Sequence, residues 1–126
     1  MNAVLVDTSV WVDHFRSGNE RLVDLLSRDL VMTHPLILGE IACGTPPNRA
    51  QTLDDLGSLQ RIRQASVDEA IAFVEGEGLF GLGCGLIDIL VLASALMTPG
   101  VDLWTLDKRL AALAERFGIP HRPGPH

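Results

Sequence analysis

Short apolar runs alternate along the chain with longer segments in which apolar residues recur every three or four positions. The first run, Ala3–Val6, is fully apolar and ends at Asp7, which is typical of a strand buried on both faces of a parallel sheet. Thr8 and Ser9 then supply side chains that start helices, and residues 10–15 continue as a short helix. This opening predicts a strand, a turn and a helix, with Asp7 at the carboxyl end of the strand.

The same alternation continues to the end of the chain. A helix predicted over 35–43 begins at a proline, ends before Gly44 and contains Glu40 in an apolar setting. A very apolar helix predicted over 86–97 contains Asp88. The other expected elements are helices over 19–27 and 108–117, two helical patterns within 48–80 with Ser66 capping the second, and strands over 30–32, 61–65 and 103–106.

Strands that alternate with helices predict an α/β fold, in which a parallel β-sheet is flanked by α-helices. Residues 1–126 fit a single domain, because one hydrophobic core usually serves about 100–150 residues. We expect residues 117–126 to form partly a flexible tail. In parallel sheets, ligands bind beyond the carboxyl ends of the strands where the winding direction reverses. Asp7 and Asp107 each follow a predicted strand, so both carboxylates are expected at that crevice.

Composition adds a partner and a compartment to this picture. Hydrophobic residues make up 47% of the chain, which is more than one small core is expected to bury, so a homodimer or a partner chain is predicted. No apolar run has the length of a membrane span, and the first residues lack the pattern of a signal peptide. Cys43 and Cys84 show no CxxC spacing and are interpreted as buried thiols in a reducing compartment. The expected location is therefore the cytoplasm.

The net charge of −6 argues against a protein that binds nucleic acid through a broad basic face. The charge is compatible with a nuclease if many of the carboxylates hold cations. It is also compatible if binding uses only a local basic strip, for which the candidates are Arg61, Arg63, Lys108 and Arg109.

Of the sixteen acidic residues, most lie in polar stretches that are typical of a solvated helix face. Asp88 is different, because apolar residues flank it on both sides and at helical spacing. Glu40 likewise has Leu36, Ile37 and Cys43 on neighbouring turns. Burial of an ionised carboxylate without a partner costs several kcal/mol, and a bound divalent cation removes that cost.

A structural interpretation of the same residues stays open. Asp7 and Asp107 are both placed to act as N-caps of the helices that follow them. Asp88 has that role too if its helix begins later than the pattern suggests. The chain has no predicted His–Cys cluster, since His14 and His34 stand alone and the other two histidines lie in the expected tail. Carboxylate oxygens without such a cluster select Mg²⁺ or Mn²⁺ over zinc.

Four segments of the chain resemble, in order and spacing, the motifs of VapC toxins, which are PIN-domain ribonucleases. These segments are Val6–Trp11, Gly39–Ile41, Gly85–Asp88 and Leu103–Leu110, and the resemblance covers nearly the whole chain. It implies a single PIN domain in which the metal-binding, catalytic set is Asp7, Glu40, Asp88 and Asp107. It also implies that Thr8 and Thr105 support those acids.

The resemblance further implies the toxin of a type II toxin–antitoxin pair, an endoribonuclease that hydrolyses RNA phosphodiester bonds with Mg²⁺ or Mn²⁺. A metal-activated water leaves a 5′-phosphate and needs neither a side-chain nucleophile nor the 2′-OH. The implied partners are a VapB-like antitoxin, an RNA substrate and a second copy of the chain. Transfer RNA and ribosomal RNA both stay open as substrates, as does the number of metal ions.

The sequence leaves other functions open. The acids are also compatible with a pocket that binds an arginine of a partner without catalysis, and the fold with another PIN-type nuclease in RNA processing. An aspartyl-phosphate phosphatase requires a second acid two residues after the first, where this chain has Ser9. A receiver domain requires an acidic pair after the first strand and a phospho-accepting Asp in mid-chain, and neither is evident.

Overall fold

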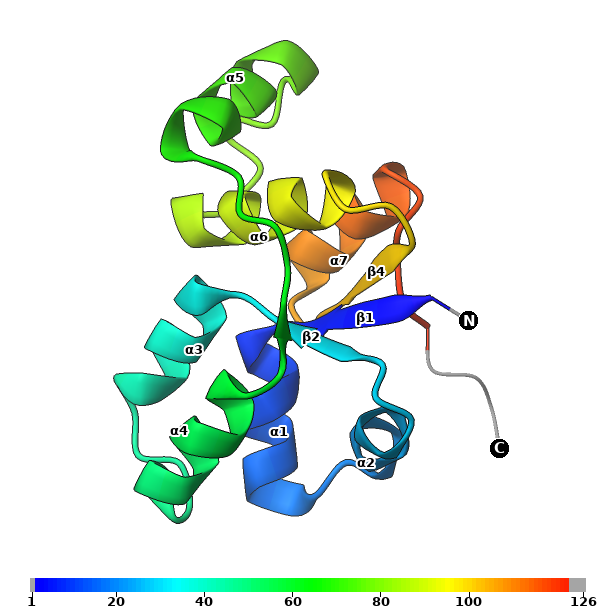
Figure 1. Ribbon diagram of the computed structural model, residues 1–126. Helices are drawn as coiled ribbons and strands as arrows, with labels where there is room; N and C mark the ends of the chain where they lie inside the picture. Colours follow the sequence, from blue (N-terminus) through cyan, green and yellow to red (C-terminus); the bar gives the residue numbers. More distant parts are fainter. Residues whose placement is uncertain (1, 123–126) are drawn as a thin grey trace.

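The computed structural model describes residues 2–122, which form one parallel sheet surrounded by helices (Figure 1). The strands are β1 (Ala3–Val6), β2 (Val31–Thr33), β3 (Gln60–Arg61) and β4 (Val101–Trp104). The helices are α1 (Thr8–Ser17), α2 (Glu20–Ser27), α3 (Pro35–Ala42), α4 (Arg49–Gly57), α5 (Val67–Glu77), α6 (Leu86–Leu96) and α7 (Lys108–Arg116).

The strand order of the sheet is β3-β2-β1-β4, and every neighbouring pair is parallel. The chain winds outward from β1 to β2 and β3, and then crosses back to place β4 on the other side of β1. The winding direction therefore reverses between β1 and β4, and the carboxyl ends of these two strands meet at that point. The predicted α/β fold with a parallel sheet is confirmed.

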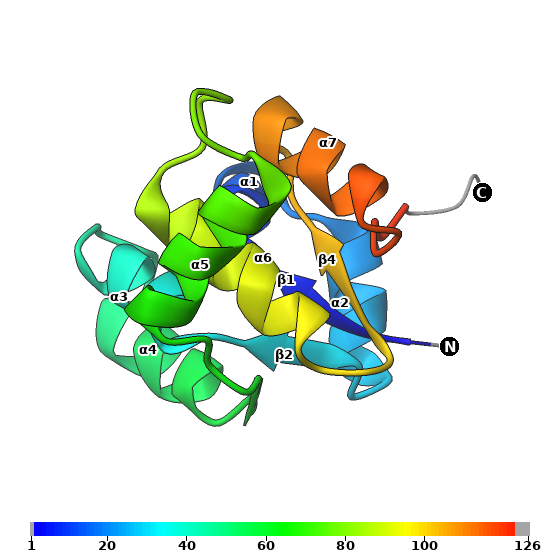
Figure 2. The same cartoon turned by 90° about the horizontal axis from the view of Figure 1, so that it is seen from above.

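Helices cover both faces of the sheet. In Figure 1, α1 and α2 lie on one face, whereas α6 lies on the other with α5 outside it. Figure 2 shows α5 crossing over α6, and the two helices are in contact. Residues 89–95 of α6 are all buried, because the helix lies between the sheet and α5. This position explains why its sequence is apolar on every side.

Two differences from the expected elements have a clear cause. The strand expected over 103–106 begins at Val101 instead, because Val101 already pairs with Ala3 of β1, and it ends at Trp104. The strand expected over 61–65 is only Gln60–Arg61, since the chain then leaves the sheet toward α5.

Part of the expected tail lies beside the sheet. The backbone N–H of Leu103 donates to the carbonyl of Ile119 at 2.7 Å, and the N–H of His121 donates to the carbonyl of Leu103 at 2.9 Å. Residues 123–126, which complete the expected tail, lie outside the described residues, so a flexible tail stays a prediction. Within residues 2–122, each helix falls short of the length and apolar character needed to cross a membrane.

The prediction that both cysteines are buried is wrong. Cys43 is exposed, because it follows the last turn of α3 as the C-cap, and Cys84 is partly exposed in the segment before α6. Both thiols are free.

Candidate active site

Asp7 lies directly after β1 and is the N-cap of α1. Its Oδ2 accepts hydrogen bonds from the hydroxyls of Ser9 and Thr105, both at 2.8 Å, and from the backbone N–H of Ser9 at 3.4 Å. Only 7% of the residue is exposed. All of these bonds converge on one oxygen, and among the described residues Oδ1 accepts none. The carboxylate is thus fixed in place with one oxygen still available.

Ser9 and Thr105 also join the two strand ends to each other. The Ser9 hydroxyl accepts from the backbone N–H of Leu106 at 2.9 Å, and the Thr105 hydroxyl accepts from the N–H of Asp107 at 3.1 Å. This network fixes the turn after β4 against the turn after β1. Thr105 has the supporting position that the resemblance implied for it. Ser9 was interpreted only as a helix-starting residue, although a hydroxyl two residues after an Asp at a strand end is well placed for such a bond.

Asp107 is the N-cap of α7. Its Oδ1 accepts from the backbone N–H groups of Arg109 at 2.9 Å and Leu110 at 3.0 Å. Its side chain is exposed, and its Oδ2 has no hydrogen bond within the described part of the chain. Asp107 thus resembles Asp7, because one oxygen caps a helix and the other is available.

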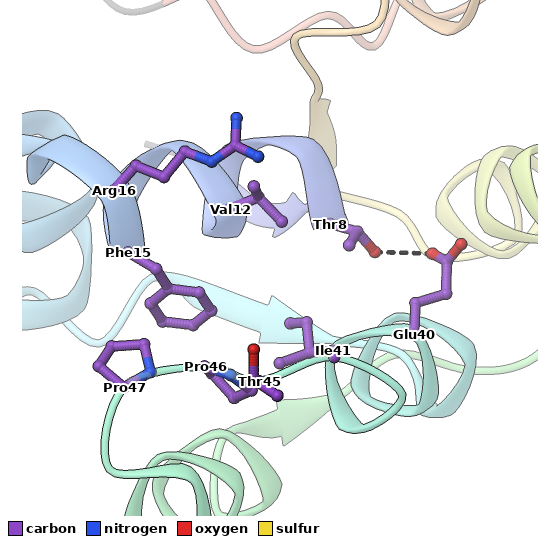
Figure 3. Close-up of a pocket in the computed structure, with 10 residues that line it drawn as sticks. Thr8, Val12, Phe15, Arg16, Glu40, Ile41, Thr45, Pro46 and Pro47 are labelled. Carbon is purple, nitrogen blue, oxygen red and sulfur yellow. Dashed lines mark hydrogen bonds between the residues drawn. The ribbon is translucent and has the colours of Figure 1, made fainter.

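Glu40 lies near the end of α3 and faces the start of α1. The Thr8 hydroxyl donates to Glu40 Oε1 at 2.7 Å, which Figure 3 shows as the link between the two helices. Thr8 is therefore a support for an acid, as the resemblance implied. Glu40 itself is exposed, so the inference that its apolar neighbours bury it is wrong. The apolar residues beside it face the core, whereas Glu40 lies on the opposite side of a short helix.

Asp88 is the third residue of α6 and is half-buried. Burial is the main factor that raises the pKa of its carboxyl group, and the negative charge of Asp7 follows. A hydrogen bond from the backbone of Gly85 opposes that rise, while the charges of Asp107 and Glu40 add to it. Asp88 therefore lies close enough to the other three predicted acids to be affected by each of them. The interpretation of Asp88 as a cap of a later helix is wrong, since α6 begins at Leu86.

The donor chemistry of these four side chains fits a hard divalent cation, because it consists of carboxylate oxygens. Asp7, Glu40 and Asp107 each have one oxygen that accepts no hydrogen bond among the described residues. Within residues 2–122, however, no three His, Cys, Asp or Glu side chains are close enough to hold a metal ion among themselves. Mg²⁺ commonly takes one or two carboxylates and keeps several waters, so the two observations are compatible. Of the four acids only Asp7 is buried, so desolvation favours a bound cation less strongly than the sequence suggested.

A buried network connects the helices that carry Glu40 and Asp88. His34 caps α3, with its Nδ1 accepting from the N–H of Leu36 at 3.0 Å. Its Nε2 lies 3.2 Å from the hydroxyl of Ser94 in α6, which donates to the carbonyl of Leu90 and accepts from the N–H of Ala65. Because the Ser94 proton is used toward Leu90, His34 must donate from Nε2 and is neutral. Burial lowers the pKa of His34, which favours the same state.

The four basic residues proposed as a single strip are divided between two places. Lys108 and Arg109 begin α7 beside Asp107, whereas Arg61 and Arg63 lie at and after β3, on the opposite edge of the sheet. Arg109 packs against Gly83 and donates to its carbonyl at 3.4 Å. A single strip is therefore wrong, because β1 and β2 separate the two pairs.

Comparisons with known proteins agree with this geometry. Residues 4–116 match the family described as the PIN domain. The chain is 40% identical over 116 residues to Ribonuclease VapC32 of Mycobacterium tuberculosis, in strains CDC 1551 / Oshkosh and ATCC 25618 / H37Rv, and this match covers 92% of the chain and 94% of the relative. Its fold is similar to the crystal structure of PAE2754 from Pyrobaculum aerophilum, with a TM-score of 0.58 at 17% identity over 93% of this chain and 96% of the other.

Proposed function

This chain belongs to the VapC-type PIN-domain family, and from that premise we propose that it is the toxin of a toxin–antitoxin pair, an endoribonuclease that requires Mg²⁺ or Mn²⁺. The observation that supports the proposal is that Asp7, Glu40 and Asp107 all lie close enough to Asp88 to affect its carboxyl group. After burial, the negative charges of these three acids contribute to the raised pKa of Asp88. The relative at 40% identity is named a ribonuclease, which supports the same activity.

Each acid has a distinct task in this proposal. Asp7 and Asp107 offer their free oxygens from two helix starts, where the Ser9–Thr105 network fixes their separation. Asp88 completes the cluster from α6, and Glu40 approaches from α3 with its orientation set by Thr8. Together they would hold the cation and the water molecules on it. When bound, the cation supplies charge neutralisation at the phosphodiester and a more acidic water.

The proposal extends to partners and location. An RNA-cleaving enzyme in the cytoplasm requires an inhibitor, and we propose a VapB-like antitoxin that inserts an arginine among the four acids. A guanidinium suits such a site because it is always charged and binds carboxylates bidentately. A homodimer belongs to the same proposal.

A metal titration combined with RNA cleavage tests this function. The protein is incubated with RNA in Mn²⁺, in Mg²⁺ and in EDTA, and the new ends are mapped. We expect cleavage only with metal, 5′-phosphate ends, and a thermal midpoint that rises with Mn²⁺ because the ion binds the folded state. Asp7→Asn is the matched variant, because it removes the carboxylate but keeps a side chain that caps a helix. Equal cleavage in EDTA would contradict the proposal.

A second candidate is an acidic pocket that binds an arginine of a partner without catalysis. It is favoured by the helix-capping roles of Asp7 and Asp107 and by the lack of a three-ligand group in residues 2–122. A pocket of this kind should gain no stability from Mn²⁺ and should cleave no RNA. The same titration therefore separates the two functions.

A further inference from the structure

A groove adjoins the acidic site on the side of α1. It has a volume of about 410 Å³ and lies between the face of α1 that carries Val12 and Arg16, the end of α3, and residues 44–47 (Figure 3). Thr8 and Glu40, joined by their hydrogen bond, also line it. The groove is therefore continuous with the proposed catalytic cluster through Glu40.

The outer wall of the groove is fixed by the chain's own hydrogen bonds. The guanidinium of Arg49 donates to the carbonyls of Ala42 at 2.6 Å and Gly44 at 3.3 Å, and the Thr52 hydroxyl donates to the carbonyl of Pro47 at 2.5 Å. A ligand thus finds a wall that is already formed and does not have to order a loop, which favours binding.

Arg16 supplies a positive charge at this groove. It is exposed, and within residues 2–122 its guanidinium has no hydrogen bond or ion pair, whereas Arg28, Arg49 and Arg116 all have partners. In Figure 3 its side chain extends from α1 in the direction of Val12 and Thr8. A cation in the last turn of α1 is also favoured by the helix macrodipole. The macrodipole does not explain why the Arg16 side chain lines the groove.

The remaining lining is mostly apolar. Phe15 faces Pro46 and Pro47 across the groove, and Val12 and Ile41 also line it (Figure 3). An aromatic ring and proline rings form surfaces against which a nucleobase can stack, and a guanidinium binds a phosphate bidentately. A nucleotide combines the flat apolar group and the anion that such a groove fits.

We propose that this groove binds the nucleotide next to the cleaved bond, with its phosphate on Arg16 and its base between Phe15 and the two prolines. The inference rests on the proposed ribonuclease function. Because the chain as a whole repels polyanions, a local contact of this kind is what retains the RNA.

Steady-state cleavage of a short labelled oligoribonucleotide tests the phosphate contact. We compare Arg16→Gln, Arg16→Lys and, as the matched control, Arg28→Gln, which removes the same charge from the end of α2, before β2 begins and outside the residues that line the groove. Loss of one phosphate contact should raise KM about tenfold with kcat within about twofold, and lower the slope of log affinity against log salt by about 0.7. Arg16→Lys should keep the slope, and Arg28→Gln should behave as the wild type.

The base contact is tested on the wild-type protein with oligonucleotides that carry one abasic site at successive positions. We expect one position beside the cleaved bond at which KM rises about tenfold, because stacking on an aromatic ring contributes about 1–3 kcal/mol per base. In Phe15→Leu that sensitivity should shrink, while a substrate that is abasic elsewhere is cleaved as before.

Three outcomes would overturn the inference. One is a KM and salt slope for Arg16→Gln equal to those of the wild type, and another is a fall in kcat alone. The third is that Arg16→Gln weakens binding of a protein inhibitor but leaves KM for RNA unchanged, which would assign the groove to a peptide. These results differ from a failure of the ribonuclease proposal itself, in which the wild type would cleave no RNA.

Discussion

Two aspartates at the candidate site each cap a helix with one carboxylate oxygen and leave the other oxygen without a hydrogen bond among the described residues. In Asp7 the Oδ2 atom accepts every hydrogen bond, and in Asp107 the Oδ1 atom does so. From sequence, capping and metal binding were alternatives for each residue. At the residue scale they are compatible, because a carboxylate has acceptor capacity for both.

The first prediction concerns the half-buried acid of α6. Asp88→Asn should reduce metal-dependent cleavage beyond the roughly 10–100-fold that loss of a supporting residue costs. In EDTA the same variant should have a higher thermal midpoint than the wild type. Burial and the neighbouring negative charges raise the pKa of Asp88, and Asn carries no charge that either of them would penalise. Paired cleavage and melting measurements check both parts. Wild-type cleavage by Asp88→Asn would remove Asp88 from the catalytic set.

The second prediction is that His34 makes the folded protein less stable at acidic pH. Burial lowers its pKa in the folded protein, so the unfolded chain binds the proton more tightly. The contribution of His34 to stability is then present above its unfolded pKa of about 6.5 and is lost as pH falls toward the folded value, at up to about 1.4 kcal/mol per pH unit. Protonation also ends the acceptor role of Nδ1 toward Leu36 and so removes the cap of α3.

Urea unfolding between pH 8 and pH 5.5 measures this effect. Burial lowers the pKa of His121 as well, so the comparison is made in a His121→Gln background. Adding His34→Asn should remove most of the remaining fall in unfolding free energy. An equal fall with and without His34 would show that another group is responsible.

At the scale of elements, the starts of helices determine how the acids are placed. α1 begins directly after Asp7, the first residue beyond β1, whereas Thr105 and Leu106 separate β4 from Asp107, the cap of α7. In both cases the cap residue lies beyond the carboxyl end of a strand. α3 differs, because its cap is His34 and its acid lies in its last turn. The site therefore depends on where helices begin and on the tie between α3 and α6.

The third prediction separates the helix-capping role of Asp107 from its proposed role as a metal ligand. Asp107→Asn keeps a side-chain oxygen for the N–H groups of Arg109 and Leu110, whereas Asp107→Ala removes it. Both variants should lose cleavage, but only the alanine variant should lose stability, by about 1 kcal/mol or roughly 4 °C in Tm. Calorimetry and cleavage assays on the pair check this. Equal stability of the two variants would show that the cap contributes nothing.

Elements with strong periodic or capping patterns were predictable from the sequence. β1 and α6 begin at the expected residues, and Ser66 caps α5 through a capping box with Glu69. β4 was misplaced because Asp102 interrupts its apolar pattern, although the residue lies in the strand opposite Val4. Pairing between distant segments decides that register, and a local pattern does not contain it.

The sequence predicted which strand ends carry Asp7 and Asp107, but it did not predict the surroundings of the candidate acids. The order of strands at the switch point places Asp7 beside Asp107, which follows from the alternation of strands and helices. The exposure of Glu40 depends on which face of a short helix meets the core. The pairing of His34 with Ser94 joins residues sixty positions apart, and no spacing rule indicates it.

At the scale of the whole molecule, apolar surface remains after the core is formed. Phe80, in the segment before α6, is 68% exposed, Leu86 at the start of α6 is 50% exposed, and Ile71 in α5 is 53% exposed. One small core cannot enclose 47% hydrophobic residues, which was the expectation from composition. The described chain thus has surface suited to association.

The last prediction is that the isolated protein is a two-fold dimer that buries this surface, since two-fold dimers are the commonest assemblies and each large apolar side chain contributes about 1.5–3 kcal/mol on full burial. Light scattering at micromolar concentration should give the mass of two chains. Phe80→Asp should shift the population to monomer, because it places a charge where an apolar contact is expected. Val23→Asp is the matched control, as Val23 is 51% exposed on α2, away from this segment. A wild-type monomer would contradict the dimer, and equal dissociation of both variants would place the contact elsewhere.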